Sequence, residues 1–266
     1  MVDRFGKKLH ITGKKLFLLD QDGTIYNDGS LFDATPEFLK TIKRLGGRYV
    51  FITNNSSKSV DDYVRKLTKM GISCDREDFF TSSQATALYL HAHYPGKKVY
   101  CVGTKSLQAE LQAAGIELTD SEHAEVALMG YDTELTYQKL MDLSRLLTQK
   151  DVPYIATNPD WVCPVDFGFA PDCGSFAFMI EKATGKMPFF IGKPRPAMIE
   201  LVMEKFHYKK EETVVIGDRL YTDIQSAINA GVTSICVLSG EAKLDDVISG
   251  DIKPDYTLDS IADIFK

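Results

Sequence analysis

The sequence predicts an α/β protein whose core is a Rossmann-like, doubly wound parallel sheet, with an inserted α/β cap domain. Strand-like and helix-like segments alternate along almost the whole chain, as they do when helices cover a parallel sheet. The run Leu16–Leu19 is entirely apolar, which is typical of a parallel strand buried on both faces. The predicted strands outnumber those that one compact doubly wound domain of 266 residues usually holds, which indicates an insertion.

The first part of the chain contains three predicted helices and one further strand. The second helix starts at Ser59, a residue type that caps helix N-termini, and Gly71 follows its end, where glycine is favoured. The helices are expected at 36–45, 59–70 and 83–94, and the strand at 48–53.

The same alternation continues to the end of the chain. Strands are expected at 98–102, 126–131, 153–157, 213–216 and 234–238. Helices are expected at 104–114, 136–148, 174–183, 196–206 and 222–230, with a short helix from 259.

Residues suited to chemistry are concentrated near the two ends of the chain, before position 60 and after position 190. The middle is therefore interpreted as the insertion. We expect a catalytic core made of residues 1–81 and 187–266, and an inserted α/β cap made of residues 82–186.

The composition is that of a soluble globular protein, with 44% hydrophobic and 26% charged residues. A net charge of −6 argues against nucleic acid as a partner, because a surface that binds phosphate backbones is usually basic. The N-terminal segment is basic, but no apolar segment of signal-peptide length follows it. We therefore expect neither a signal peptide nor a membrane span.

The five cysteines are widely spaced and include no CxxC pair. This pattern predicts reduced thiols rather than a disulfide framework or a zinc site, and so a cytoplasmic location. His91 and His93 lie two positions apart on a predicted helix, so they point to different faces and are not expected to bind a metal.

Two carboxylates, Asp20 and Asp22, follow the first strand, and Gly23 closes the turn after them. Ligands of open α/β sheets bind beyond the carboxyl ends of the strands. Two anions this close repel each other unless a cation or a shared proton is present. The pair therefore indicates Mg²⁺ chemistry, proton transfer or both, with an Asp-rich turn as the alternative.

Three further segments place polar side chains beside predicted strands. In chain order they are Phe51–Ser57 (FITNNSS), Gly192–Pro194 (GKP) and Val214–Asp223 (VVIGDRLYTD). Taken singly, they are also compatible with a polar loop, an exposed lysine and an acid at a helix start. Their occurrence together and in order favours a function.

The residue types in these segments suit phosphoryl transfer. Carboxylates bind Mg²⁺, which completes its octahedron with water and phosphate oxygens. A lysine and a hydroxyl group offset the charge of the equatorial phosphate oxygens. One carboxylate can attack phosphorus, while a second protonates the leaving oxygen and then activates water.

The motifs DxDGT, TNNSS, GKP and GDRLxTD resemble those of the haloacid dehalogenase-like (HAD) phosphohydrolases. More narrowly, the chain resembles the 4-nitrophenylphosphatase and NagD-like branch, which has a large α/β cap between the second and third motifs. The resemblance covers nearly the whole chain and includes the segments Thr157–Asp160 and Ala183–Pro188. The set of motifs is highly specific, although GKP alone is weak.

The resemblance implies a role for each residue at the strand ends. Asp20 would be the nucleophile and Asp22 the general acid and base. Thr53 and the backbone of Asn54 would bind phosphate, and Lys193 would orient and neutralise both nucleophile and phosphate.

The resemblance also implies a metal site. Mg²⁺ would be held by Asp20, the main-chain carbonyl of Asp22 and Asp218, with Asp223 acting through water. Asn158 of the cap is expected to contribute to substrate binding. Relatives that cleave carbon–halogen bonds need no acid at the position of Asp22, so its presence favours phosphate esters.

The chain departs from the family pattern in the segment Phe169–Ser175, where Asp172 and Cys173 replace the usual smaller residues. Asp172 is expected either to face the active site and influence the leaving group, or to cap the following helix. Trp161, the single tryptophan, is expected either to line the substrate pocket or to lie in the core of the cap.

We therefore predict a Mg²⁺-dependent phosphatase that acts on a small phosphorylated metabolite through an aspartyl-phosphate. A phosphotransferase or mutase on the same fold is the alternative, and a receiver-like phospho-acceptor is disfavoured by the chain length and the position of Asp20. The resemblance is compatible with phosphoglycolate, glycerol phosphate, nucleotides, sugar phosphates and pyridoxal phosphate. Relatives often pair through the cap, so a homodimer is expected.

Overall fold

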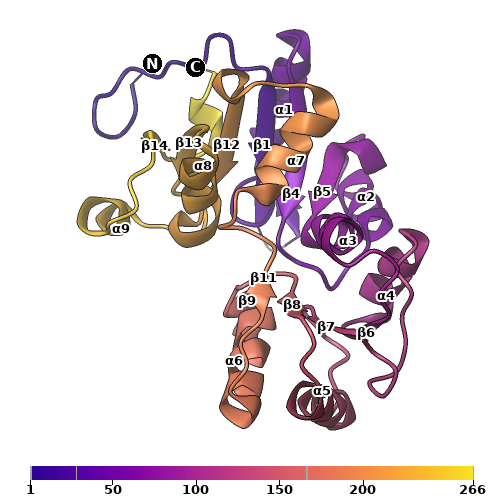
Figure 1. Cartoon of the computed structure of the whole chain (residues 1–266). Coiled ribbons are helices and arrows are strands. Elements are labelled where there is room, and N and C mark those ends of the chain that lie inside the picture. Colours follow the sequence, from indigo (N-terminus) through magenta and orange to yellow (C-terminus); the bar gives the residue numbers. More distant parts are fainter. Residues whose placement is uncertain (1, 28, 166, 266) are drawn as a thin grey trace. The chain divides into compact units, whose positions relative to one another are not determined.

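The computed structural model describes residues 2–27, 29–165 and 167–265, and they form two compact units (Figure 1). The first unit contains the chain as far as Thr53, Val64–Phe80 and the residues from Lys193 onward. The second unit contains Asn54–Tyr63 and Thr81–Gly192. Each unit has its own sheet and its own hydrophobic core.

The first unit is built on a six-stranded sheet in the order β14-β13-β12-β1-β4-β5. β1 lies in the middle, parallel to β12 on one side and to β4 on the other. Its four side chains are at most 2% exposed, as a strand covered on both faces requires. The strands are β1 (Leu16–Leu19), β4 (Arg48–Thr53), β5 (Phe79–Thr81), β12 (Thr213–Gly217), β13 (Thr233–Val237) and β14 (Tyr256–Leu258).

Helices cover this sheet, with α1 packed against β4 and α8 against β13. α7 and α8 pack against each other. The helices are α1 (Thr35–Arg44), α2 (Val60–Lys69), α7 (Ala197–Phe206), α8 (Gln225–Ala230) and α9 (Leu244–Ser249). The parallel, helix-covered sheet confirms the predicted fold class.

The second unit is built on a four-stranded parallel sheet in the order β11-β8-β7-β6. Its helices are α3 (Ser82–His93), α4 (Lys105–Ala113), α5 (Tyr137–Gln149) and α6 (Cys173–Thr184). Its parallel strands are β6 (Val99–Val102), β7 (Val126–Met129), β8 (Tyr154–Ala156) and β11 (Phe189–Phe190). β9 (Val162–Val165) and β10 (Gly168–Pro171) form a separate antiparallel pair.

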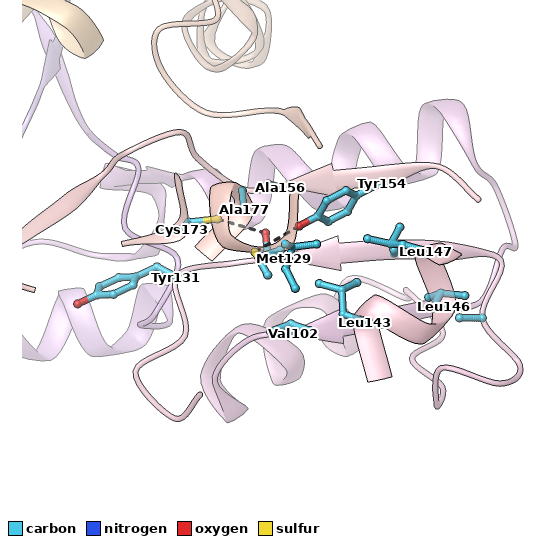
Figure 2. Packing of buried hydrophobic residues seen from close by; sticks show 13 residues of the cluster. Val102, Met129, Tyr131, Leu143, Leu146, Leu147, Tyr154, Ala156, Cys173 and Ala177 are labelled. Carbon is cyan, nitrogen blue, oxygen red and sulfur yellow. Dashed lines mark hydrogen bonds between the residues drawn. The ribbon is translucent and has the colours of Figure 1, made fainter. Parts of the chain in front are cut away.

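The core of the second unit joins β7 and β8 to α5 and α6 (Figure 2). Met129 lies at its centre, and the phenol of Tyr154 donates a hydrogen bond to its sulfur at 3.4 Å. The thiol of Cys173 reaches the carbonyl of Met129 at 3.6 Å. Leu143 and Leu147 of α5 are fully buried in the same cluster.

Most expected elements are found, with shifts of a residue or two at their ends. The N-cap of α3 is Thr81, which forms a capping box with Gln84, so the helix begins at Ser82 rather than at 83. The expected helix at 222–230 is instead a π-helical turn, Leu220–Ile224, followed by α8. In place of the helix expected from 259, the described residues at this end form a single 3₁₀ turn, Ile261–Asp263.

Several short elements have no counterpart in the expected pattern: the pair β2 (Tyr26–Asn27) and β3 (Ser30–Leu31), the hairpin β9–β10, and β5, β11, β14 and α9. Most of these have four residues or fewer, too short for a hydrophobic period to be visible in the sequence. All five cysteines are free thiols, as expected. Among the described helices, none is long and apolar enough to cross a membrane.

Candidate active site

Three strands of the first unit deliver polar residues to one edge of the sheet. β1 aligns with β4 through the pair Leu19 and Phe51, and with β12 through Leu19 and Ile216. The amide of Asp20 continues this ladder by donating to the carbonyl of Ile216 at 2.9 Å. Because these strands are parallel, Asp20, the β4 terminus at Thr53 and Asp218 after β12 lie at the same, carboxyl edge.

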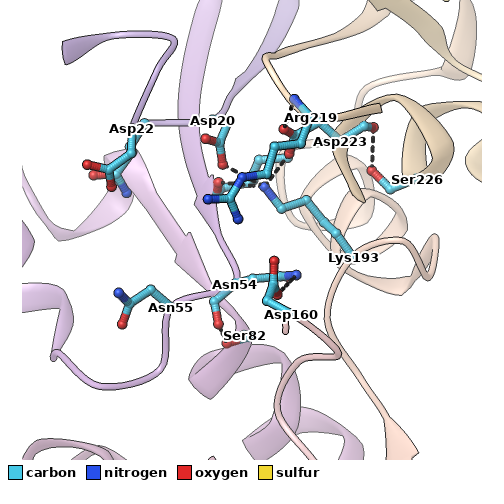
Figure 3. Close-up of polar contacts among 12 residues, drawn as sticks. Asp20, Asp22, Asn54, Asn55, Ser82, Asp160, Lys193, Arg219, Asp223 and Ser226 are labelled. Carbon is cyan, nitrogen blue, oxygen red and sulfur yellow. Dashed lines mark hydrogen bonds and ion pairs between the residues drawn. The ribbon is translucent and has the colours of Figure 1, made fainter. Parts of the chain in front are cut away.

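Lys193 supplies a positive charge at this carboxyl edge of the sheet. Its ammonium lies 2.7 Å from Oδ1 of Asp20 and 2.5 Å from Oδ1 of Asp223 (Figure 3). A third hydrogen bond, at 3.3 Å, goes to the carbonyl of Ile52 in β4. The lysine is only 2% exposed, so the expectation of an exposed loop lysine does not hold. Burial disfavours its charge, but the two carboxylates outweigh burial and raise the pKa of Lys193 above its usual value.

Asp223 is held in place by two neighbours. Its Oδ1 accepts from Lys193, and its Oδ2 accepts from the backbone amide of Arg219 at 3.1 Å. The carboxylate is thus enclosed by the π-helical turn on which it lies. Burial and the negative charge of Asp20 raise the pKa of Asp223 to about 6, although Lys193 opposes this shift.

Asp218 has one oxygen bound and one oxygen without a partner. Its Oδ2 accepts from the amide of Glu241 at 2.7 Å, whereas its buried Oδ1 has no hydrogen-bond partner among the described residues. A methyl group added at Gly23 or at Gly240 would overlap this carboxylate, so both glycines permit its close enclosure. Burial and the charges of Asp20 and Asp223 raise the pKa of Asp218 well above its usual range.

These features fit a hard divalent cation. One oxygen from each of Asp20, Asp218 and Asp223 can be chosen so that all three lie within 4.8 Å of one another. A buried carboxylate oxygen without a donor is costly, and a cation at that place relieves both this cost and the mutual repulsion of the acids. Oxygen-only donors of this kind suit Mg²⁺ or Ca²⁺ rather than softer metals.

Asp22 has a different environment from Asp20. Its Oδ2 accepts a hydrogen bond from the phenol of Tyr26 at 3.0 Å, and its Oδ1 lies 3.9 Å from the ammonium of Lys66. The side chain of Asp22 is exposed, but partial desolvation by the surrounding protein raises its pKa, with a smaller contribution from the charge of Asp20, while Lys66 and Tyr26 act in the opposite direction. A carboxyl with a raised pKa is suited to proton transfer.

Asn54, which directly follows Thr53, belongs to the second unit. Its carboxamide donates to Oδ2 of Asp160 at 2.7 Å, and its carbonyl accepts from the hydroxyl of Ser82 at 2.6 Å (Figure 3). A Cβ at Gly192 would lie 2.5 Å from its side-chain oxygen, so the asparagine is packed tightly as well. Main chain and side chain are therefore fixed within the second unit.

Asn158 completes this cluster without reaching the surface. Its side-chain amide lies 2.9 Å from Oδ2 of Asp160 and 3.0 Å from Oδ1 of Asp172, and its oxygen accepts from Thr157 at 2.8 Å. Asn158 is fully buried. Asp172 also accepts from the amide of Cys173 at 2.5 Å and is the N-cap of α6, so of its two expected roles the capping role is observed.

Trp161 is 53% exposed, which contradicts a position in the core of the second unit. It packs edge-on against Phe178, with 5.6 Å between the ring centroids. No pattern in the sequence indicates that Tyr26 and Lys66 lie beside Asp22. Asp160 lies in the segment Thr157–Asp160, which the family resemblance includes, but its hydrogen bond to Asn54 spans 106 positions.

The comparisons with known proteins agree with this arrangement. Residues 17–117 match the haloacid dehalogenase-like hydrolase family, and residues 190–264 match the HAD-hydrolase-like family. The chain belongs to the haloacid dehalogenase-like hydrolases, in the branch that contains the NagD and 4-nitrophenylphosphatase proteins.

Individual relatives match over nearly their whole length. The acid sugar phosphatase of Staphylococcus aureus strain MRSA252 is 34% identical over 91% of this chain and 93% of its own. The 4-nitrophenylphosphatase structure from Thermotoga maritima superimposes with a TM-score of 0.91 at 39% identity, covering 96% of this chain and 97% of that one. NagD from E. coli K-12 gives a TM-score of 0.87 at 33% identity, covering 94% of this chain and 98% of that one.

Proposed function

We propose that the protein is a Mg²⁺-dependent phosphatase that hydrolyses the phosphate monoester of a small metabolite through an aspartyl-phosphate. The buried ammonium of Lys193 between Asp20 and Asp223 carries this proposal, together with the Asp218 oxygen that has no partner among the residues the structure describes. Such a site gathers a nucleophile and a fixed positive charge at one place, and leaves a carboxylate oxygen for a metal. The family and the printed names of the relatives support the same activity.

In the proposed reaction, a carboxylate oxygen of Asp20 attacks phosphorus while the bond to the leaving oxygen breaks. Asp22 gives its proton to that leaving oxygen. Asp22 then takes a proton from water, whose oxygen attacks phosphorus and releases Asp20 and inorganic phosphate. Lys193 stays protonated and positively charged throughout the reaction, because its pKa is raised.

Asp20, the main-chain carbonyl of Asp22, and Asp218 would hold Mg²⁺. When bound, the ion would supply positive charge that offsets the charge of the phosphate oxygens. Asp223 has both oxygens occupied by Lys193 and Arg219, which supports an indirect role through water and through Lys193.

Thr53 and the backbone of Asn54 are assigned to phosphate binding, together with Lys193. Ser82 and Asp160 fix the carbonyl and the side chain of Asn54, which supports a rigid peptide at this place. Asn158 is assigned an indirect part in substrate binding, because its buried amide orients Asp160.

The second unit is assigned the part of the cap that selects the substrate, with residues 82–186 as its expected extent.

We also propose that two copies associate through this unit, in the cytoplasm. The exposed aromatic side chains near the β9–β10 hairpin support this, since they include Trp161, Phe167 and Phe169. Sedimentation of the wild type, Phe167→Ser and Phe169→Ser tests this association. A wild-type protein that stays monomeric at all concentrations would reject it.

The experiment that tests the proposed function is hydrolysis of 4-nitrophenyl phosphate by the purified protein with Mg²⁺. Asp20→Asn should keep the fold and abolish turnover, and substantial remaining activity would exclude Asp20 as the nucleophile. A panel of phosphorylated metabolites ranked by kcat/KM then identifies the substrate class. Product analysis with competing sugar acceptors distinguishes hydrolysis from phosphotransfer.

A further inference from the structure

Tyr26 lies beside Asp22 because the chain turns back on itself between them. The amide of Ile25 donates to the carbonyl of Gln21 at 2.8 Å, and the amide of Gly23 donates to the carbonyl of Tyr26 at 2.8 Å. This turn places the phenol of Tyr26 3.0 Å from Oδ2 of Asp22. Tyr26 is fully buried, so its ring holds the phenol at a fixed position.

Lys66 reaches the same two residues from α2. Its ammonium lies 3.8 Å from the centroid of the Tyr26 ring and 3.9 Å from Oδ1 of Asp22. A cation over an aromatic face is attracted to the ring and withdraws electron density from it, which strengthens the phenol as a hydrogen-bond donor. The phenol and the ammonium thus face different oxygens of one carboxylate.

Gln21 extends this contact on the other side of the phenol. Its Oε1 lies 3.4 Å from the hydroxyl of Tyr26, while its buried Nε2 has no partner among the described residues. One phenol proton cannot serve both Gln21 and Asp22. Exchanging the amide oxygen and nitrogen lets Gln21 donate to the phenol oxygen, and the phenol proton is then committed to Asp22.

We propose that Tyr26 and Lys66 are positioning residues for proton transfer by Asp22, a role that rests on the proposed phosphatase function. In an in-line displacement, the leaving oxygen lies on the far side of phosphorus from the nucleophile. Figure 3 shows the carboxylate of Asp22 set apart from Asp20 and turned away from Lys193, as a donor to that oxygen requires.

The contacts also suit the change of charge at Asp22. When the bond from phosphorus to the leaving oxygen breaks, the proton of Asp22 passes to that oxygen and leaves a carboxylate behind. The phenol and the ammonium are already in place to stabilise this charge, with no reorganisation. The same contacts hold the carboxylate while it removes a proton from water in the second step.

The dependence on the leaving group separates this role from a structural one. A 4-nitrophenolate ion leaves without a proton, whereas an alkoxide requires one. For Tyr26→Phe and Lys66→Met we expect kcat/KM, which reports the step that releases the leaving group, to fall about tenfold or more with glycerol phosphate and less than about threefold with 4-nitrophenyl phosphate. Lys66→Arg keeps the positive charge and should restore part of the loss.

The first unit contains a matched control pair. The ammonium of Lys43 lies 4.8 Å from the centroid of the Tyr49 ring, and this tyrosine is only 2% exposed. Tyr49→Phe removes the hydroxyl and Lys43→Met the ammonium of a similar stacked pair, at a place to which we assign no part in catalysis. They should change kcat/KM on the two esters by the same small factor.

A double-variant comparison completes the test. In an Asp22→Asn background, Tyr26→Phe should cause no further loss with glycerol phosphate, because its effect passes through Asp22. Equal losses on the two esters, or additive losses with Asp22→Asn, would overturn the positioning role and leave the phosphatase function intact. Failure of the wild-type protein to hydrolyse any ester would overturn the function itself. Should Tyr26→Phe fail to fold, Lys66→Met, whose side chain is 28% exposed, decides by the same comparison.

Discussion

The ammonium of Lys193 lies 2.7 Å from Oδ1 of Asp20, a residue 173 positions earlier in the chain. The same ammonium lies 2.5 Å from Asp223, so one buried cation serves two carboxylates. Burying an ion pair gains little net stability, but breaking one leaves charge without compensation. The principal contribution of Lys193 is therefore to make the acidic cluster tolerable in the folded protein.

Lys193→Met should destabilise the protein through these carboxylates. With a chelator at neutral pH, we expect the free energy of unfolding to fall by about 3–5 kcal/mol. The deficit should shrink as the pH falls, because protonated carboxyls need no counter-charge. Lys205→Met, which removes a solvent-exposed pair with Glu77, should cost less than about 1 kcal/mol. Urea denaturation compares the two, and equal losses would contradict a shared buried cation.

Asp218 should have opposite effects on stability with and without metal. Without metal, Asp218→Asn should unfold at a higher temperature than the wild type, because the variant no longer buries a charge repelled by Asp20 and Asp223. With Mg²⁺ at about 100 times its Kd, the wild type should gain about 2.7 kcal/mol by linkage, whereas Asp218→Asn should gain far less. Thermal unfolding with and without Mg²⁺ measures this crossover. The exposed Asp259→Asn is the control, and a similar Mg²⁺ gain in Asp218→Asn would exclude Asp218 as a ligand.

The strand ends could be predicted from the sequence because their signal is local. An apolar run fixes β1, and the acids that follow it must then lie at the carboxyl edge of a parallel sheet. Asp218 was located by the same rule after β12. Lys193 stands out in the sequence only as one of several ordered polar segments, and its specific role follows from the family resemblance, since a lysine between glycine and proline has no distinct local signal.

The neighbours of these residues could not be predicted, because they depend on tertiary proximity. The approach of Lys66 to Asp22 requires α2 to pack over the turn that carries Tyr26. The exposure of Trp161 follows from its place just before the β9–β10 hairpin, whose strands are too short to show a period. Neither the approach of Lys66 to Asp22 nor the exposure of Trp161 follows from the position of these residues along the chain.

Asp160 should be important for the stability of the second unit. Asp160→Ala removes the acceptor that the buried amide of Asn54 contacts and one of the two acceptors of Asn158, which should cost about 1–3 kcal/mol. Asp160→Asn keeps one oxygen as an acceptor and should cost less. The exposed Asp151→Ala, which removes a surface contact with Lys186, is the control. Urea unfolding followed by the fluorescence of the single tryptophan, Trp161, reports on this unit, and equal costs at Asp160 and Asp151 would contradict the network.

Buried phenols and thiols should make the second unit sensitive to alkaline pH. Burial raises the pKa of Tyr100 and of the Cys101 thiol to about 12, and raises the pKa of Tyr154 and of Cys173 further. These groups stay neutral in the folded unit, whereas the unfolded chain ionises at the ordinary pKa values. Their contribution to stability is therefore complete below pH ~8.5 and decreases as the pH rises toward the folded values.

Tyr154→Phe tests this dependence with little change in shape, since it removes only the hydroxyl group that faces the sulfur of Met129. Each such group lowers the free energy of unfolding by about 1.4 kcal/mol per pH unit above its unfolded pKa. The variant should therefore lose stability less steeply than the wild type between pH ~9.5 and pH ~11. Tyr137 is 77% exposed, so Tyr137→Phe is the control at an exposed tyrosine and should follow the wild-type slope. Urea unfolding at several pH values, followed by Trp161 fluorescence, measures the slope of stability against pH for the wild type and the two variants. If Tyr154→Phe has the same slope as the wild type, this phenol ionises in the folded unit as readily as in the unfolded chain.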